Sequence, residues 1–312
     1  MVQRILVIGS SNTDMVVKAN KLPAPGETVI GGTFLMNPGG KGANQAVAAA
    51  RLGADVTFVA KVGNDIFGKQ AIQGFRQDKI RTEFVFSDAK NPSGVALIGV
   101  DEQGENCIMV APGANAHLLA YEVVQALESV SEAELLLLQL EIPLQTVTAA
   151  VEHGAKRGLK IILNPAPAQP LPNEIYANLF AITPNETETK LLTGITVEAH
   201  DLGSLREAAE WFLAKGLKNV IITLGAKGAF LYNEEGGKLI AAPPVTATDT
   251  TAAGDVFNGA LVVALSETKS LSEAVTFACK AASISVTRMG AQASVPTRKE
   301  VDALSLSNVT KP

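Results

Sequence analysis

The sequence contains few residues able to form disulfides or bind transition metals. Its 312 residues include only two cysteines, Cys107 and Cys279, and three histidines, His117, His153 and His200. These five residues are far apart in the sequence and lack the spacing of a zinc-ligand set. The sequence therefore excludes a disulfide framework and gives no indication of a zinc site.

Long hydrophobic runs and clusters of basic residues are also missing. The apolar stretch near the N-terminus is too short for a signal peptide, and the run LLLL at 135–138 is far below the length of a membrane span. The 26 Lys and Arg residues are dispersed among 31 Asp and Glu, which leaves a net charge of −5. Because binding to nucleic acid needs clustered cations, we do not expect nucleic acid as a partner. Since neither a signal peptide nor a membrane span is evident, we expect a cytoplasmic protein that does not bind a membrane.

The remaining composition indicates a large α/β fold. Hydrophobic residues make up 47% of the chain, which is typical of a globular protein. Short apolar runs alternate with helical patterns, and this order predicts a mostly parallel sheet covered on both faces. The expected strands are 4–9, 56–62, 134–140, 160–164, 179–183 and 219–224. The expected helices are 42–53, 66–77, 144–158, 204–216, 254–266 and 271–287.

Two segments interrupt this alternation. Residues 15–36 contain prolines, glycines and a strand-like alternation, and residues 93–111 read as a hairpin around DEQGEN. We expect both segments to form a small accessory sheet. Such a sheet is marginally stable alone, so it should cover either a substrate cleft, as a lid, or a second subunit. Since no linker is evident, residues 1–312 are predicted to form a single α/β domain with these two insertions.

The segment DTTAAGD at 249–255 precedes an apolar helix and is the most informative motif. Its small side chains leave the backbone N–H groups of Ala252, Ala253 and Gly254 uncovered at a helix N-terminus, where an anion can bind. Asp255 would lie beside that anion. A carboxylate there is suited to accepting a proton from a hydroxyl that attacks a phosphoryl group. The alternative is that Asp249 and its neighbours only cap the helix.

Two motifs in the first fifty residues could bind a sugar. In GSSNTD at 9–14, Asn12 and Asp14 would point the same way along a strand and could hold vicinal hydroxyls, although a turn would use the same residues. In NPGGKGANQ at 37–45, glycines around Lys41 permit close approach of a ligand at a helix start. A glycine turn with a surface lysine is the alternative. Neither motif is a Walker loop or a dinucleotide fingerprint.

Three later motifs give weaker signals. Glu141 follows an apolar strand, at the edge where open α/β sheets bind ligands. In TPNETE at 183–188, Asn185 and Glu188 form a capping box and could also hold Mg²⁺-bound water near phosphates. The turn in ITLGAKGAF at 222–230 would admit a nucleotide, although a plain hairpin explains it equally well.

The order of these motifs resembles the ribokinase family of sugar and nucleoside kinases. GSSNTD, PGGKGANQA, QLE, NPAPA, TPNETE, TLGAKG and DTTAAGD occur in that family's order, and the similarity covers about residues 4 to 300. The resemblance implies a three-layer α/β/α fold with a lid. It also implies ATP-dependent phosphorylation of D-ribose at O5, with Mg²⁺, a K⁺ activator and a homodimer paired through the lid sheets.

The resemblance also assigns roles to individual residues. Asp255 would be the catalytic base, with Ala252, Ala253 and Gly254 as the anion hole. The sugar would be bound by Asn12, Asp14, Gly40, Lys41, Asn44, Glu141 and Asp255. The nucleotide would contact Asn185, Glu188, Thr223, Leu224, Gly225, Ala226, Lys227, Gly228, Gly254 and Cys279. The positions that match the monovalent-cation site are Asp249, Thr251, Ser285, Arg288, Gly290 and Ser294.

Other functions remain as alternatives. Another sugar kinase of the same family, deoxyribokinase above all, would use the same motifs. A nucleoside kinase is disfavoured because no aromatic cluster accompanies the sugar motifs. A sugar-binding protein without catalysis would not need the intact base and anion site. A nicotinamide-dependent dehydrogenase would need the missing dinucleotide fingerprint.

Overall fold

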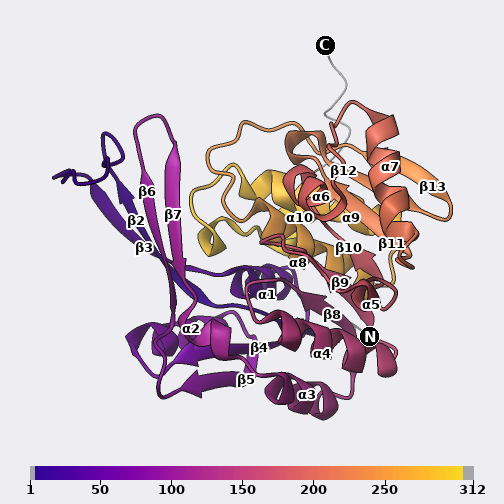
Figure 1. Ribbon diagram of the computed structural model, residues 1–312, viewed down its shortest axis with the longest axis horizontal. Coiled ribbons are helices and arrows are strands. Elements are labelled where there is room, and N and C mark those ends of the chain that lie inside the picture. The colour runs from indigo at the N-terminus through magenta and orange to yellow at the C-terminus, as the bar shows by residue number, and fades with distance from the viewer. Residues whose placement is uncertain (1–3, 305–312) are drawn as a thin grey trace.

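The computed structural model describes residues 4–304, which form a layered α/β body with a separate projecting sheet (Figure 1). The strands of the body are β1 Arg4–Ile8, β4 Val56–Gly63, β5 Arg81–Asp88, β8 Ala133–Leu138, β9 Lys160–Leu163, β10 Ala181–Ile182, β11 Asn219–Thr223, β12 Ala229–Asn233 and β13 Gly236–Ile240. Its helices are α1 Lys41–Arg51, α2 Ile66–Gln77, α3 Ala120–Ser129, α4 Leu144–Lys156, α5 Asn173–Tyr176, α6 Glu186–Thr193, α7 Leu202–Leu213, α8 Ala253–Ser266, α9 Leu271–Ser285 and α10 Arg298–Ala303.

Within residues 4–304, nine strands form the main sheet in the order β13-β12-β11-β10-β9-β8-β1-β4-β5. Every neighbouring pair from β11 to β5 is parallel, whereas β12 and β13 are antiparallel additions at one edge. Parallel strands require covered faces, which explains why β1 and β8 are almost continuously apolar.

Two hydrophobic cores lie on opposite faces of this sheet. Because successive side chains of a strand alternate, Ile5 and Val7 of β1 contact one core while Leu6 and Ile8 contact the other. Helices α1, α8 and α9 cover the first core, and α3, α4 and α7 cover the second. The result is the expected three-layer α/β/α arrangement.

The projecting sheet has four strands in the described part of the chain, ordered β3-β2-β6-β7. They are β2 Asn12–Lys18, β3 Thr33–Gly39, β6 Gly94–Val100 and β7 Asn106–Ala111. This sheet, which we call the lid, stands beside the body at the left of Figure 1. Its strands come from the two predicted insertions. The first of these begins earlier than expected, because Asn12 and Asp14 already belong to β2.

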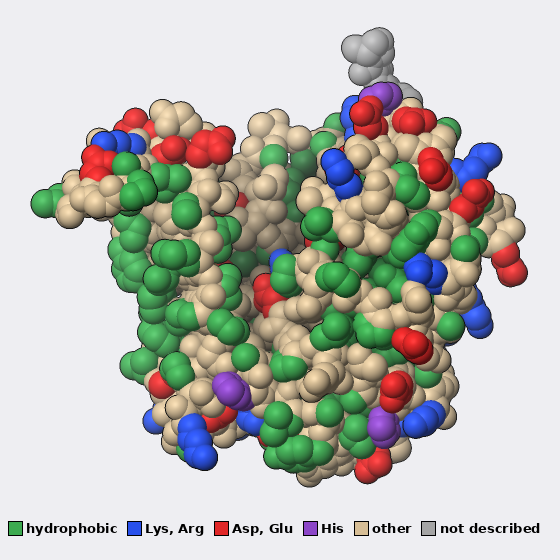
Figure 2. All heavy atoms as spheres, viewed as in Figure 1, with side chains coloured by type: hydrophobic (Ala, Val, Ile, Leu, Met, Phe, Trp, Pro, Cys, Tyr) green, Lys and Arg blue, Asp and Glu red, His purple; other side chains and the backbone are tan. Residues whose placement is uncertain are grey.

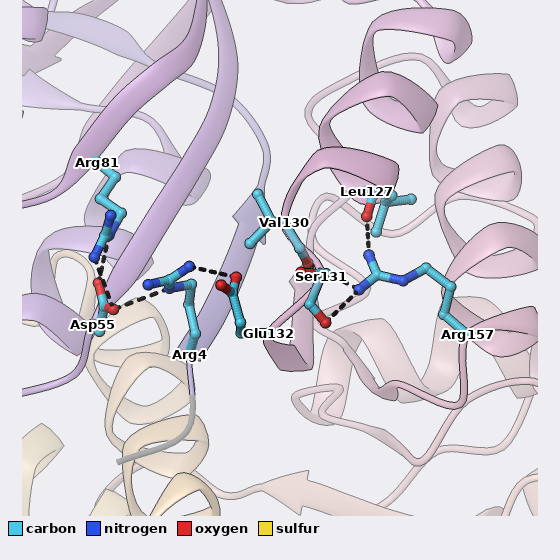
Figure 3. A network of polar contacts seen from close by, with 8 residues as sticks. All are labelled: Arg4, Asp55, Arg81, Leu127, Val130, Ser131, Glu132 and Arg157. Carbon is cyan, nitrogen blue, oxygen red and sulfur yellow. Dashed lines mark hydrogen bonds and ion pairs between the residues drawn. The ribbon is translucent and has the colours of Figure 1, made fainter. Parts of the chain in front are cut away.

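Ion pairs and hydrogen bonds of charged side chains connect the amino ends of the body's strands (Figure 3). Arg4, at the start of β1, contacts Asp55 at 3.0 Å and Glu132 at 2.8 Å, and Arg81 contacts Asp55 at 2.8 Å. Arg157, after α4, donates to the Val130 carbonyl at 2.9 Å, where α3 ends. A basic group at a helix C-terminus is favourable. These contacts lie at the edge of the sheet opposite to the carboxyl ends of the strands.

The structure confirms the expected elements, with small shifts at their ends. The helix expected at 66–77 is α2, and the hairpin around DEQGEN joins β6 to β7. The sequence did not predict five elements: β5, β13, α3, α5 and α10. In α3 the N-cap residue is Leu119 rather than a polar residue, so the helix has no polar start signal. No helix among residues 4–304 is long and apolar enough to span a membrane. The ends of the expected domain, 1–3 and 305–312, lie outside the described residues.

Candidate active site

The site lies where the strand order reverses. After β1 the chain returns to the body as α1 on one face, whereas the chain after β8 continues as α4 on the other face, so a crevice forms beyond the carboxyl ends of these two strands. The lid strands begin directly after β1, and the first turn of α8 reaches the same crevice. Figure 2 shows the molecule hollowed between the lid and the body.

Asp255, in the first turn of α8, is held by two amides from α1. Its side chain is buried, with 6% of the residue exposed. Asn44 Nδ2 donates to Asp255 Oδ2 and Gln45 Nε2 donates to Asp255 Oδ1, both at 2.9 Å. The two helices can approach this closely because Gly259 has no side chain: a Cβ there would lie 2.6 Å from Ala48 Cβ. The pKa of Asp255 is raised by burial, which outweighs the lowering by Lys41 and by the two amides.

The loop before α8 presents backbone donors. Ala252 adopts the left-handed conformation with φ 59°, which is strained for a residue with a Cβ and is typical of functional loops. None of the described residues accepts a hydrogen bond from the N–H of Ala252, Gly254 or Asp255. One expectation was wrong: the N–H of Ala253 is not free, because it donates to the Thr250 carbonyl at 3.2 Å. The turn that shapes the loop uses this N–H.

A lysine lies among several carboxylates in the crevice. Lys41 Nζ is 4.0 Å from Glu141 Oε1, and its backbone N–H donates to Glu141 Oε2 at 3.0 Å. Burial lowers the pKa of Lys41, but Asp255, Glu141 and other carboxylates outweigh it and leave the pKa raised. Burial, together with Glu141 and Asp255, raises the pKa of Asp14 to about 6. The excess of negative charge is suited to a neutral, hydroxyl-rich ligand, since hydroxyls can donate to these oxygens.

Asn12 and Gly40 shape the wall of the crevice below the lid. Asn12 Oδ1 accepts from Asn115 Nδ2 at 2.8 Å, which leaves Asn12 Nδ2 without a partner among the described residues. Gly40 has φ 88°, and a Cβ there would lie 2.7 Å from the backbone N of Asn12. Only glycine therefore permits this contact between the start of α1 and β2.

The expected nucleotide residues lie at the ends of β10 and β11. Asn185 and Glu188 form the predicted capping box of α6, with Glu188 N donating to Asn185 Oδ1 at 2.8 Å and Asn185 N donating to Glu188 Oε2 at 2.9 Å. Burial raises the pKa of Glu188, and Asp255 adds to this effect. Thr223 ends β11, and residues 225–227 form a 3₁₀ turn before β12. Cys279 lies buried on α9, with its Sγ 4.0 Å from the Ile240 carbonyl.

The residues of the expected cation site join two segments. Asp249 Oδ2 accepts from the N–H of Gly290 at 2.8 Å, and Oδ1 accepts from the N–H of Thr251 at 2.9 Å. These hydrogen bonds outweigh burial, which acts in the opposite direction, and leave the pKa of Asp249 below its ordinary value. The hydroxyls of Ser285 and Ser294 donate to nearby carbonyls of their own segments. In residues 4–304 no group of three or more His, Cys, Asp or Glu has the arrangement of a metal site.

Comparison with known proteins identifies the family. A family model described as pfkB family carbohydrate kinase matches residues 2–298. The chain belongs to the pfkB family of carbohydrate kinases. The expected family and fold are therefore confirmed, and with them the expectation of an ATP-dependent sugar kinase.

The similarity to individual members of the pfkB family covers nearly whole chains. A ribokinase of Haemophilus influenzae is 46% identical over 96% of this chain and 97% of its own. A deoxyribokinase of Salmonella typhi is 39% identical over 94% of this chain and 95% of its own. The structure of Arabidopsis thaliana ribokinase complexed with ribose and ATP matches with a TM-score of 0.88. It is 34% identical to this chain, and the match covers 96% of this chain and 98% of the other.

Some residues of the site were not found from the sequence. Gln45 contacts Asp255 and lies within the NPGGKGANQ motif, but its own role was not predicted. Asn115, which orients Asn12, lies outside every predicted motif. Ser10 Oγ donates to Glu141 Oε2 at 2.6 Å and lies within the GSSNTD motif without having been singled out. Their partners are distant in sequence, so only the folded chain reveals these pairings.

Proposed function

We propose that this pfkB-family kinase transfers the γ-phosphoryl group of ATP to O5 of D-ribose, with Asp255 as the general base. The observation that carries this proposal is the position of Asp255. Its buried carboxylate lies in the first turn of α8, below the lid. The N–H groups of Ala252 and Gly254, next to it, have no hydrogen-bond partner among residues 4–304. The near full-length similarity to ribokinases supports ribose as the substrate.

The proposed mechanism needs little covalent chemistry from the protein. Asp255 accepts the proton of the attacking hydroxyl, while the N–H groups of Ala252 and Gly254 stabilise charge on the phosphoryl oxygens. Asn12, Asp14 and Glu141 would orient the sugar so that its hydroxyl is in line with the phosphorus. Because Asp255 is buried and its pKa is raised, it is a stronger base than an exposed carboxylate.

The residues present also fit the two cations expected for this reaction. Asn185 and Glu188 supply oxygen ligands that suit Mg²⁺ or its waters, and Mg²⁺ would neutralise charge on the nucleotide's phosphates. Asp249 carries an ionised carboxylate where two segments meet, and backbone carbonyls of Thr251, Ser285, Arg288, Gly290 and Ser294 could complete a K⁺ site. The hydrogen bonds of Asp249 already hold the loop that aims the N–H groups.

The outer face of the lid supports the proposed homodimer. Asp14 points toward the crevice, so the residues paired with Met15 and Val17 lie on the opposite face. That face exposes Val17, Phe34, Met36, Leu97 and Met109. Figure 2 shows hydrophobic side chains along the left edge of the lid. A continuous exposed apolar patch of this kind marks an interface, and a second lid offers the complementary face.

Deoxyribokinase is the second candidate because a curated deoxyribokinase is also similar to the chain. Asn12 favours ribose, since its Nδ2 is free to donate to a further hydroxyl. If 2-deoxyribose were bound, this buried N–H donor would have no hydroxyl to bond, and the site would therefore discriminate against the deoxy sugar. We expect kcat/KM for ribose to exceed that for 2-deoxyribose by about 10² or more.

The decisive experiment is a panel of sugars assayed for ADP release with MgATP, with and without K⁺. Asp255→Asn should lower kcat by about 10² to 10⁴, with sugar affinity largely kept. Asp55→Asn is the matched control, because Asp55 lies at the opposite end of the strands (Figure 3). Full turnover by Asp255→Asn would remove Asp255 from the role of base, and absence of any sugar-dependent ADP release would overturn the ribose assignment.

A further inference from the structure

Gln45 contacts the proposed base but cannot contact the substrate. Its side chain is completely buried, with 0% exposure, and it follows Asn44 on α1. Asn44 Nδ2 and Gln45 Nε2 donate to different oxygens of Asp255. Asn44, which is 6% exposed, belongs to the expected sugar site and could contact a ligand directly. Gln45 has no such access, so its hydrogen bond to Asp255 is independent of the ligand.

A chain of hydrogen bonds determines which way the Gln45 amide points. The carbonyl of Thr183 can only accept, so Asn164 Nδ2 must donate to it, at 3.2 Å, and Asn164 Oδ1 is therefore an acceptor. Gln45 Nε2 donates to this oxygen at 3.0 Å and to Asp255 Oδ1 at 2.9 Å. Gln45 Oε1 accepts from Gln139 Nε2 at 2.6 Å. The NH₂ group of Gln45 thus has both hydrogens committed, one of them to Asp255.

The charges around Asp255 make this donor important. Lys41 from α1 is the cation that faces Asp255, whereas Glu141 after β8, Asp14 on β2 and Glu188 on α6 are like charges that act against its ionisation. Burial acts in the same direction as these carboxylates. A buried carboxylate that loses a hydrogen-bond donor takes up a proton more readily, and a protonated carboxyl cannot accept the proton of the substrate.

We propose that Gln45 is a positioning residue for Asp255: its buried amide fixes the plane of the carboxylate and keeps it able to accept a proton. The inference rests on the proposed role of Asp255 as base. Asn164 and Gln139 hold Gln45 from the carboxyl ends of β9 and β8, so the sheet itself orients the base on α8.

The test is the pH profile of phosphoryl transfer in a single turnover. In Gln45→Met, which keeps the side-chain length but has no amide, we expect the acid limb to move up by about one pH unit. At pH values below the wild-type acid limb the rate should be about 10-fold lower than that of the wild type at the same pH. It should recover as the pH rises, with ribose KM changed by less than about threefold. A purely structural defect would instead lower the rate equally at every pH. Gln139→Met is the matched control, since it disrupts the same network but keeps the donor to Asp255, so its acid limb should stay in place.

Gln45→Glu provides a second variant of nearly the same shape, in case Gln45→Met does not fold. A carboxylate at position 45 adds a like charge next to Asp255, so the acid limb should move further up than in Gln45→Met. An acid limb that stays at the wild-type pH in Gln45→Glu, or one that moves equally in Gln139→Met, overturns the proposal. Asp255→Asn separates the two hypotheses: if it retains full turnover, the base assignment itself has failed, whatever the Gln45 variants do.

Discussion

Asp14 is expected to destabilise the ligand-free protein at neutral pH. It is partly buried on the crevice face of β2, and its carboxylate accepts no side-chain or backbone hydrogen bond from the described residues. Burial and the charges of Glu141 and Asp255 raise its pKa from 3.8 to about 6. We predict that Asp14→Asn, which resembles the protonated form, stabilises the ligand-free protein and weakens its activity.

The magnitude follows from the shift in the pKa. A shift of about two units corresponds to about 3 kcal/mol of free energy of unfolding, and we reduce this to about 1–2 kcal/mol because Asp14 retains access to water. The native state binds the proton of Asp14 more tightly than the unfolded state. The contribution of this group to stability is therefore complete below pH 3.8 and is lost as the pH rises through about 6.

The assay is urea unfolding of the ligand-free protein at fixed protein concentration. At pH 8 Asp14→Asn should be more stable than the wild type by about 1–2 kcal/mol, and the difference should vanish near pH 4. Asp88→Asn is the matched control: hydrogen bonds from Lys90 N, then from the side chain and N–H of Asn91, lower the pKa of Asp88 to about 2, so its loss should destabilise at pH 8. Equal stability of Asp14→Asn and wild type at pH 8 would refute the reasoning. The kcat/KM of Asp14→Asn for ribose should fall about 10- to 100-fold, because the sugar hydroxyl loses a partly buried, charged hydrogen-bond acceptor.

Three further predictions concern packing, the lid and a buried ion pair. Gly40→Ala should abolish most activity, since its Cβ would collide with the backbone of Asn12, and an ADP-release assay with ribose on the folded variant checks this. Phe34→Asp on the outer lid face should shift a dimer toward monomer in analytical ultracentrifugation; an unchanged sedimentation coefficient would argue against pairing through the lid. Lys61→Met leaves Glu122 charged and buried without its 2.7 Å partner, so urea unfolding should show a loss of about 3–5 kcal/mol, which Glu122→Gln in the same chain should partly restore.

The sequence was sufficient to predict the fold because its signals are local. A helix with capping residues and a 3.6-residue pattern, such as Ile66–Gln77, is visible in a short window of sequence. The apolar strands of the parallel sheet are equally distinct. By contrast, β5 alternates and lies at a sheet edge, where burial imposes a weaker pattern. The capping box of Asn185 and Glu188 was likewise predictable, since all its partners lie within one helical turn.

The candidate site was predictable only where a motif contains its own chemistry. Asp255 and the small residues before it predict an anion-binding helix start, and this role stays a prediction. The turn that engages the N–H of Ala253 became evident only from the structure. The roles of the individual site residues stay predictions until they are tested by mutation.

The sequence by itself determined the layered α/β fold, the family and the segments that meet at the crevice, because apolar periodicity and contiguous motifs are written along the chain. Only the tertiary structure decided that Gln45 reaches Asp255 across 210 positions and that Asn115 orients Asn12. Such contacts depend on how closely two helices pack at Gly259 and on which face of a sheet each strand presents. These are distances in space, and no local pattern of residues encodes them.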